Sequence, residues 1–145
     1  IILAATDLLA DTKLAPELSN EAHYYRAKAY LDAGKTDGAM EDLKVLAKDT
    51  RNVYGAEAKY KVAQIYFDGG QTDKAEQEVL NYIEVSTPHT YWLARSFVLL
   101  ADVYMKLGRN LDAKQYLLSL KQNYQADDDI AGMIESRLEK LKTEN

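Results

Sequence analysis

Apolar residues recur along the chain in short stripes with the spacing of an α-helix. Phe97, Leu100, Ala101 and Tyr104 lie at positions i, i+3, i+4 and i+7, which places their side chains on one face of a helix. A second stripe follows each of three glycines: Ala39, Leu43 and Leu46; Ala75, Val79 and Tyr82; and Ala113, Leu117 and Leu120. The pattern therefore predicts pairs of amphipathic helices, each joined by a turn at a glycine.

One arrangement of residues occurs three times. Each copy has an alanine, a tyrosine three residues later, a glycine four residues after that, and a second alanine five residues after the glycine. The copies are Ala27, Tyr30, Gly34 and Ala39; Ala63, Tyr66, Gly70 and Ala75; and Ala101, Tyr104, Gly108 and Ala113. They are 36 and then 38 residues apart, a period typical of stacked helical hairpins. We expect the alanines to let helices approach closely, with the tyrosines filling the space beside them.

Residues near the glycines predict where helices begin and end. The three repeated glycines are expected to end the first helix of each hairpin, with a positive φ that glycine adopts at least cost. Thr36-Asp37 and Thr72-Asp73 are expected to cap the second helices, with Glu76 completing a capping box. Thr87 is expected to be the N-cap of a later helix whose first residue is Pro88.

The two ends of the chain continue the same pattern. Residues 1–14 are expected to hold the second helix of a preceding repeat, with Ala4 and Leu8 buried. Leu18, like Tyr54 and Trp92, is expected to add a buried turn to the start of a first helix. The chain begins at Ile1 without Met, so we expect it to be a piece of a longer or processed protein.

The whole chain, 1–145, is thus predicted to be a single all-α domain. Its parts are the second helix at 1–14, repeats at 18–50, 53–86 and 88–125, and a C-terminal capping helix at 127–143. In that last helix Asp127, Asp128 and Asp129 precede the apolar stripe, where the helix dipole favours negative charge.

Charge and composition exclude several classes of protein. There are 18 Lys and Arg against 23 Asp and Glu, and a net charge of −5 gives no strong field that would attract nucleic acid. The absence of cysteine excludes disulfides, thiolate catalysis and sulfur-ligated zinc. The apolar start, interrupted by Asp7, is too short to cross a bilayer. We therefore expect neither nucleic-acid binding nor direct membrane insertion.

The three registered copies resemble the tetratricopeptide repeat, and the third copy matches its pattern best. The resemblance implies a right-handed α-solenoid of antiparallel hairpins, a superhelix whose first helices line a concave groove. The family repeat is usually 34 residues long, and longer hairpins of this kind are similar to those of tetratricopeptide proteins of the Gram-negative cell envelope. That narrower likeness implies a periplasmic or outer-membrane-associated location.

The resemblance also implies which residues face the groove and bind a protein or peptide partner. These are Tyr24, Lys28 and Leu31; Tyr60, Gln64 and Phe67; and Arg95, Val98, Asp102 and Met105. Tyrosine and arginine are common at interface hot spots. The alternative is that Leu31, Phe67 and Met105 only pack between hairpins. Leu99 departs from the pattern with which some family members hold a C-terminal carboxylate, so we do not expect that kind of ligand.

No set of residues predicts chemistry. His23 and His89 are the only histidines, and His23 is expected to be a core or edge residue and not a ligand or base. The three consecutive aspartates lack the alternating oxygen ligands and closing Glu of a calcium loop. We expect no catalytic residue, no cofactor and no metal. The sequence predicts a protein-binding scaffold; the alternatives are a helical-repeat RNA-binding module and a structural or self-association segment that forms a homo-oligomer.

Overall fold

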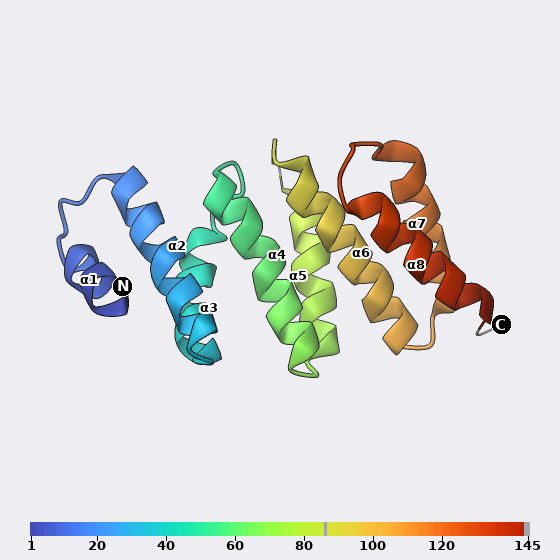
Figure 1. Ribbon diagram of the computed structural model, residues 1–145, viewed down its shortest axis with the longest axis horizontal. Coiled ribbons are helices and arrows are strands. Elements are labelled where there is room, and N and C mark those ends of the chain that lie inside the picture. Colours follow the sequence, from blue (N-terminus) through green and yellow to red (C-terminus); the bar gives the residue numbers. More distant parts are fainter. Residues whose placement is uncertain (86, 144–145) are drawn as a thin grey trace.

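The computed structural model describes residues 1–85 and 87–143 as a row of helices (Figure 1). Residue 86, the predicted end of the second repeat, and residues 144–145 of the predicted domain lie outside the described residues. The described helices are α1 (Ile2–Leu9), α2 (Pro16–Asp32), α3 (Thr36–Leu46), α4 (Val53–Asp68), α5 (Thr72–Glu84), α6 (Thr90–Lys106), α7 (Asn110–Asn123) and α8 (Ile130–Thr143). This arrangement confirms the all-α solenoid, while the division into one domain and five parts stays a prediction.

The helices form two layers. Each helix packs against the next along the chain, and the first helices of successive hairpins also touch: α2 contacts α4, α4 contacts α6, and α6 contacts α8. Within the described residues no such contact joins α3, α5 and α7. The first helices of neighbouring hairpins therefore lie closer together than the second helices do. We call the surface made by α2, α4, α6 and α8 the first-helix face.

The predicted small-residue stripes are buried. All six alanines of the repeated pattern are at most 1% exposed, and the apolar residues that follow them on α3, α5 and α7 are buried as well. The buried residues form two clusters, one around α2, α3 and α4 and the other running from α4 to α8. Stability is therefore spread along the stack between neighbouring hairpins, as expected for a solenoid.

The repeated glycines end the first helices as predicted. Gly34, Gly70 and Gly108 have φ of 74°, 79° and 77°. The residue after each glycine donates its amide hydrogen to the carbonyl of the repeat tyrosine; these bonds are Lys35 to Tyr30 at 2.8 Å, Gln71 to Tyr66 at 2.8 Å and Arg109 to Tyr104 at 2.7 Å. Together with a shorter-range bond from each glycine amide, they form a Schellman motif. The spacing of Tyr and Gly is thus the spacing this turn requires.

The caps expected for the second helices were wrong. The N-caps of α3 and α5 are Lys35 and Gln71, and neither makes a side-chain cap hydrogen bond. The connection between the two helices holds only three residues, 33–35 in the first hairpin and 69–71 in the second, so Thr36 and Thr72 already have helical backbone. A hydroxyl at that position does not have the extended geometry that lets an N-cap reach the first free amides.

The predicted start of α6 was also wrong. The helix begins at Thr90, after His89, and not at Pro88. Thr87 instead donates its hydroxyl to the carbonyl of Thr50 at 2.7 Å and accepts the His89 amide at 3.1 Å. The hydroxyl expected to cap a helix therefore ties two successive inter-hairpin loops together.

At the N-terminal end the structure shifts the predicted buried positions. Ala5 is the buried residue of α1, whereas Ala4 is exposed and Leu8 is 41% exposed. Leu18 is 47% exposed, so it does not supply the buried turn that we expected. α1 has only eight residues and packs on α2, so the side facing α2 decides which of its positions are buried.

Candidate functional site

The ten predicted groove residues all lie on α2, α4 and α6, three of the helices that make the first-helix face. They differ in exposure. Lys28 is exposed, Tyr60 and Val98 are only 7% and 3% exposed, and the rest are partly buried. Val98 therefore belongs to the core. The structure thus divides the predicted residues into those that a partner could touch and those that support the face.

Polar side chains join successive first helices at three junctions. Tyr24 on α2 donates its hydroxyl to the Glu57 carboxylate on α4, at 3.0 and 3.2 Å. Arg95 on α6 donates to the Tyr60 hydroxyl on α4 at 2.9 Å. At the third junction Arg137 on α8 makes two parallel hydrogen bonds to Asp102 on α6, at 2.8 and 2.9 Å. Four predicted groove residues therefore use their polar ends to connect hairpins: Tyr24, Tyr60, Arg95 and Asp102.

At the first junction Tyr24 lies in a cluster of aromatic side chains. Its ring centroid is 4.6 Å from that of Tyr54, and Lys61 lies over the ring at 5.7 Å while pairing with Glu57. Burial, followed by the charge of Glu57, raises the pKa of Tyr24 to about 12. The hydroxyl therefore stays protonated and remains a hydrogen-bond donor at neutral pH.

At the second junction Arg95 stacks on an aromatic ring. Its guanidinium carbon lies 4.9 Å from the centroid of the Tyr60 ring, and it also donates to the Tyr91 hydroxyl at 3.1 Å. Tyr60 in turn donates to the side-chain oxygen of Gln64 at 2.8 Å. Burial raises the pKa of Tyr60, and the neighbouring Arg95 opposes that rise. The contact between Arg95 and Tyr60 thus fixes α6 against α4, while Gln64 lies partly exposed beside Tyr60 on α4.

Leu31, Phe67 and Met105 are partly buried and pack against the two core clusters. Each also lines a hollow in the surface. Leu31 borders one of about 630 Å³ between the first two hairpins, and Phe67 and Met105 border another of about 500 Å³ that includes α8. These side chains therefore pack between hairpins while part of each stays open to solvent, and their role in binding stays a prediction.

The contribution of α8 to this face was missed. Arg137 and Lys140 line the second hollow together with Lys106 at the end of α6. The sequence did contain a signal: Arg137 follows Asp102 by 35 residues, the separation between Tyr60 and Arg95. α8 therefore occupies the place of a further first helix, and its inward-facing side chains belong to the candidate surface.

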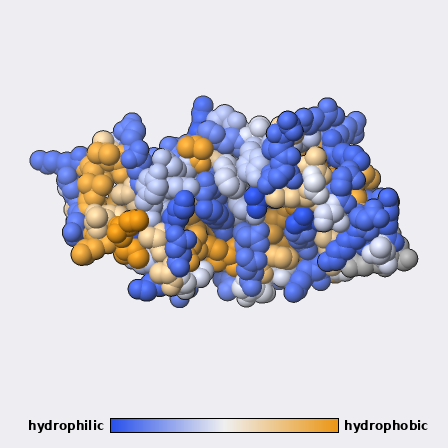
Figure 2. Space-filling view, in the orientation of Figure 1, coloured by the Kyte–Doolittle hydropathy of each residue, from blue (hydrophilic) through white to orange (hydrophobic). Residues whose placement is uncertain are grey.

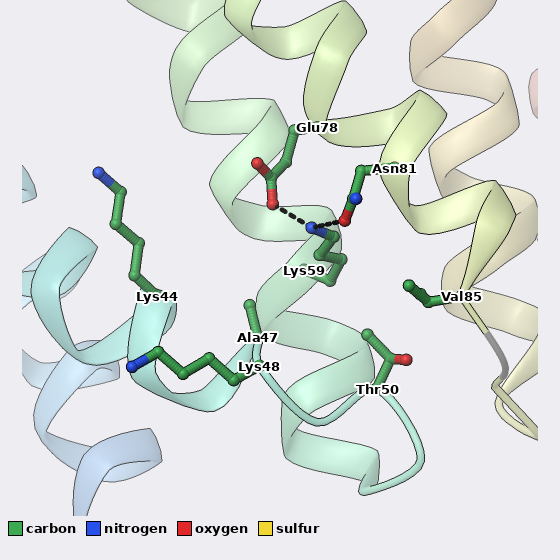
Figure 3. Close-up of a pocket in the computed structure, with 8 residues that line it drawn as sticks. All are labelled: Lys44, Ala47, Lys48, Thr50, Lys59, Glu78, Asn81 and Val85. Carbon is green, nitrogen blue, oxygen red and sulfur yellow. Dashed lines mark hydrogen bonds and ion pairs between the residues drawn. The ribbon is translucent and has the colours of Figure 1, made fainter.

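A polar hollow of about 300 Å³ lies between α3, α4 and α5 and was not foreseen (Figure 3). Lys59 is 8% exposed and binds Glu78 and Asn81, each at 2.6 Å. In Figure 3 the ammonium groups of Lys44 and Lys48 point away from this group. The buried charge is therefore matched within the protein and serves to hold α4 against α5.

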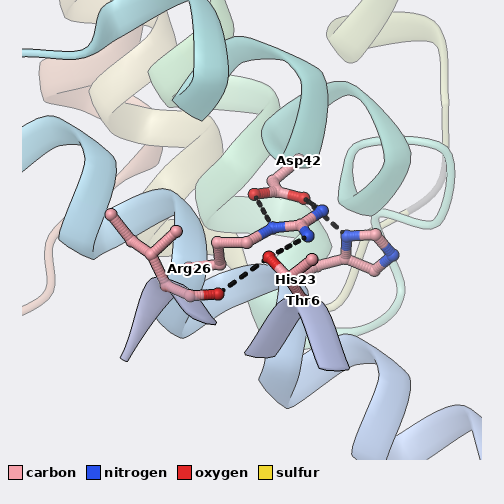
Figure 4. Close-up of polar contacts among 5 residues, drawn as sticks. Thr6, His23, Arg26 and Asp42 are labelled. Atoms are coloured by element: carbon pink, nitrogen blue, oxygen red, sulfur yellow. Dashed lines mark hydrogen bonds and ion pairs between the residues drawn. The ribbon is translucent and has the colours of Figure 1, made fainter. Parts of the chain in front are cut away.

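His23 is an edge residue with a buried carboxylate as partner (Figure 4). Its Nδ1 lies 2.8 Å from an oxygen of Asp42, which is 1% exposed and also accepts two hydrogen bonds from Arg26 at 2.6 and 2.8 Å. Arg26 donates a further bond to the Thr6 hydroxyl at 3.0 Å. These groups satisfy one another and tie α1, α2 and α3 together, which is a structural role.

The aspartates before α8 act as hydrogen-bond acceptors. Asp128 accepts the amide of Ile130, the first residue of α8, at 2.9 Å, and it also accepts the hydroxyl of Tyr124. Asp129 accepts the hydroxyl of Tyr91. Across residues 1–85 and 87–143, no group of three or more His, Asp or Glu side chains has the arrangement of a metal site.

In the part of the chain that the structure describes, no helix combines the length and apolar character needed to span a membrane.

Comparison with known protein families gave two matches, both to tetratricopeptide repeat models. One covers residues 21–49, which hold most of α2 and α3, and the other covers residues 94–123, which hold most of α6 and α7. No curated protein and no solved structure matched the chain significantly. The matched segments fall on the first and third of the three registered copies.

Proposed function

Because this chain is a tetratricopeptide repeat protein, we propose that it is a noncatalytic scaffold that binds a protein or peptide segment along its first-helix face. Repeats of this family generally mediate contacts between proteins. The observation that supports this face is that α2, α4, α6 and α8 touch in series. These helices carry partly exposed aromatic, apolar and charged side chains, which supports their use as a binding surface.

The structure narrows the set of residues proposed to touch the partner. Tyr60 and Val98 are buried, and Tyr24, Arg95 and Asp102 join neighbouring hairpins. The proposed contact residues are therefore Lys28, Leu31, Gln64, Phe67 and Met105. The junction residues hold these side chains in place, because a binding surface made of several helices keeps its shape only while the helices keep their spacing.

The test begins by immobilising the protein and selecting peptides that bind it from a phage-displayed library of random sequences. Binding of the selected peptides is measured by fluorescence anisotropy, and hydrogen exchange locates the bound surface. We expect Phe67→Ala with Met105→Ala to weaken binding at least about tenfold, since truncating anchor side chains commonly costs more than 1 kcal/mol each. The proposal fails if the bound peptides protect the second helices instead.

The matched control is Val45→Ala with Leu111→Ala. These residues are 44% and 70% exposed on the second helices α3 and α7, so the control removes a similar amount of apolar surface from the other layer. Its affinity should stay within about twofold of wild type. Circular dichroism shows whether each variant is folded. Equal losses in the two double variants would contradict a site on the first-helix face.

A second candidate function is self-association, and a specific observation favours it. Figure 2 shows apolar surface over the end of the stack that carries α1. Ile1 and Leu3 are 79% and 74% exposed, and together with Tyr25 they line an open hollow of about 770 Å³. Sedimentation velocity at several concentrations tests this candidate. Leu3→Lys should abolish any concentration-dependent oligomer, whereas Leu111→Lys should leave it unchanged.

A location in the Gram-negative cell envelope is a further proposal, supported by the length of the repeats. Fractionation of the source cells followed by immunodetection of this protein tests it. Recovery in the cytoplasmic fraction would contradict it.

A further inference from the structure

The hollow of about 500 Å³ where α4, α6 and α8 meet combines an apolar floor with cationic walls. Phe67 from α4 and Met105 from α6 pack against the core cluster and stay partly exposed. Lys106, Arg137 and Lys140 line the same hollow, together with Asp102 and Ser136. Large apolar side chains next to an excess of one charge are what a mixed apolar and charged ligand needs.

The charges around this hollow do not balance. Arg137 and Asp102 form a two-bond pair at 2.8 and 2.9 Å, so each neutralises the other. Within residues 1–85 and 87–143, no carboxylate lies within ion-pair distance of the ammonium group of Lys106 or Lys140. Two positive charges are therefore left without a partner in this part of the structure.

The hollow between the first two hairpins, which is lined mainly by α3, α4 and α5, makes a useful comparison of charge. It is of similar size, about 630 Å³, but its charged residues are Asp37, Asp68, Lys44 and Lys74, which balance. The chain as a whole carries a net charge of −5. The positive excess at the junction of α4, α6 and α8 is therefore a local feature and does not reflect the general charge of the protein.

We propose that this hollow binds a peptide segment in which an acidic residue lies next to a large apolar residue. The carboxylate would lie between Lys106 and Lys140, and the apolar side chain would cover Phe67 and Met105. The inference deepens the proposed function and rests on it. A nucleic-acid phosphate would also attract the lysines, but two lysines in a protein of net negative charge give little phosphate affinity, and the apolar floor suits a side chain.

Protein NMR with synthetic probes tests the proposal, because amide shifts report both affinity and location. One probe is a short peptide in which Glu and Leu alternate between Gly-Ser ends. The matched probes replace every Glu by Lys, or every Leu by Ser. We expect only the Glu-Leu probe to shift amides at the ends of α4, α6 and α8. The proposal is overturned if the Lys-Leu probe binds there equally well, or if the Glu-Leu probe does not bind.

Charge reversal gives a second, independent measurement. Lys106→Glu with Lys140→Glu should weaken the Glu-Leu probe at least about tenfold, since two attractive charges near a carboxylate become repulsive. Lys48→Glu with Lys114→Glu changes the net charge equally at exposed positions outside the hollow, so that variant should stay within about twofold of wild type. Equal weakening in both variants would show a general charge effect and overturn the proposal.

Two further outcomes separate this inference from the proposed function. If the library-selected peptides bind the first-helix face but the Glu-Leu probe does not, the inference fails and the proposed function stands. If the Glu-Leu probe shifts only amides of α3, α5 and α7, both fail. A third probe is a single-stranded oligouridylate. If it binds the hollow more tightly than the Glu-Leu probe at physiological salt, the hollow is a nucleic-acid site and the inference is overturned.

Discussion

The close approach of α3 and α4 allows a sharp test of the packing. Gly55 lies in the first turn of α4, beside the end of α3. A Cβ at this position would lie 1.9 Å from the backbone oxygen of Asp49 and 2.6 Å from that of Leu46. Real Cβ atoms essentially never come closer than 3.0 Å to such atoms, so Gly55→Ala requires the connection to move by about 1 Å.

The size of the effect follows from which atoms must move. Both obstructing atoms belong to the backbone, so no change of side-chain rotamer relieves the contact. Overpacking of this kind costs about 1–3 kcal/mol or more, and an alanine in a helix returns up to about 1 kcal/mol through propensity. We therefore expect Gly55→Ala to lower the free energy of unfolding by about 2 kcal/mol.

Gly132 provides the matched control within the same chain. It lies in α8, is exposed, and would place a Cβ with no atom within 4 Å. Gly132→Ala should therefore raise the free energy of unfolding by about 0.5 kcal/mol, because alanine restricts the unfolded chain and favours the helix. The same substitution is thus expected to have opposite signs at two positions.

Urea denaturation followed by circular dichroism measures both variants. Stacked hairpins can unfold in parts, so hydrogen exchange is needed to show where protection is lost. Gly55→Ala should reduce the protection from hydrogen exchange in α3 and α4, whereas Gly132→Ala should leave that protection unchanged. The reasoning is refuted if Gly55→Ala is as stable as wild type, or if the two variants lose equal stability.

Three more changes test other parts of the structure. Gly70→Ala places alanine at a φ of 79° in open space, so urea denaturation should show a loss of about 1 kcal/mol from backbone strain alone. Tyr24 should ionise near its pKa of about 12 in a spectrophotometric titration; because this value is raised above the unfolded one, the stability it contributes is complete below about pH 10 and is lost as the pH rises toward 12. Tyr24→Phe should reduce the amplitude of that step by one tyrosine, since burial also raises the pKa of Tyr124 to about 12, and an unchanged titration would contradict the assignment. Asp42→Asn should cost about 2 kcal/mol and expose α1 to hydrogen exchange, because Arg26 and His23 lose their buried partner. Asp112→Asn, at an exposed ion pair, is its control and should cost less than about 0.5 kcal/mol.

The repeats could be identified from the sequence alone. Helical spacing, the alanine stripes and the glycine turns predicted hairpins stacked in series, and these features depend only on contacts within a hairpin or between neighbours. The positive φ of Gly70 belongs to this group, since the turn that needs it is complete within the six residues from Tyr66 to Gln71.

The prediction was weaker wherever a residue's role depends on a distant segment. Thr87 resembles a helix cap, but the loop at Thr50 offers its carbonyl as a partner. Tyr60 and Arg95 resemble binding residues, but Arg95 on α6 donates a hydrogen bond to Tyr60 on the neighbouring helix α4. In each case the local sequence shows a polar group without showing which neighbour is close enough to bind it.

The sequence by itself therefore determined the fold class, the repeat period and the positions of the first and second helices of each hairpin. Only the tertiary structure decided which side chains on the first-helix face connect hairpins and which remain open. It also placed α8 at the end of the same face, where Lys106 and Lys140 stand without a carboxylate partner within the described residues. The physical reason is that helix formation depends on local spacing, whereas exposure and charge balance depend on how closely separate helices approach.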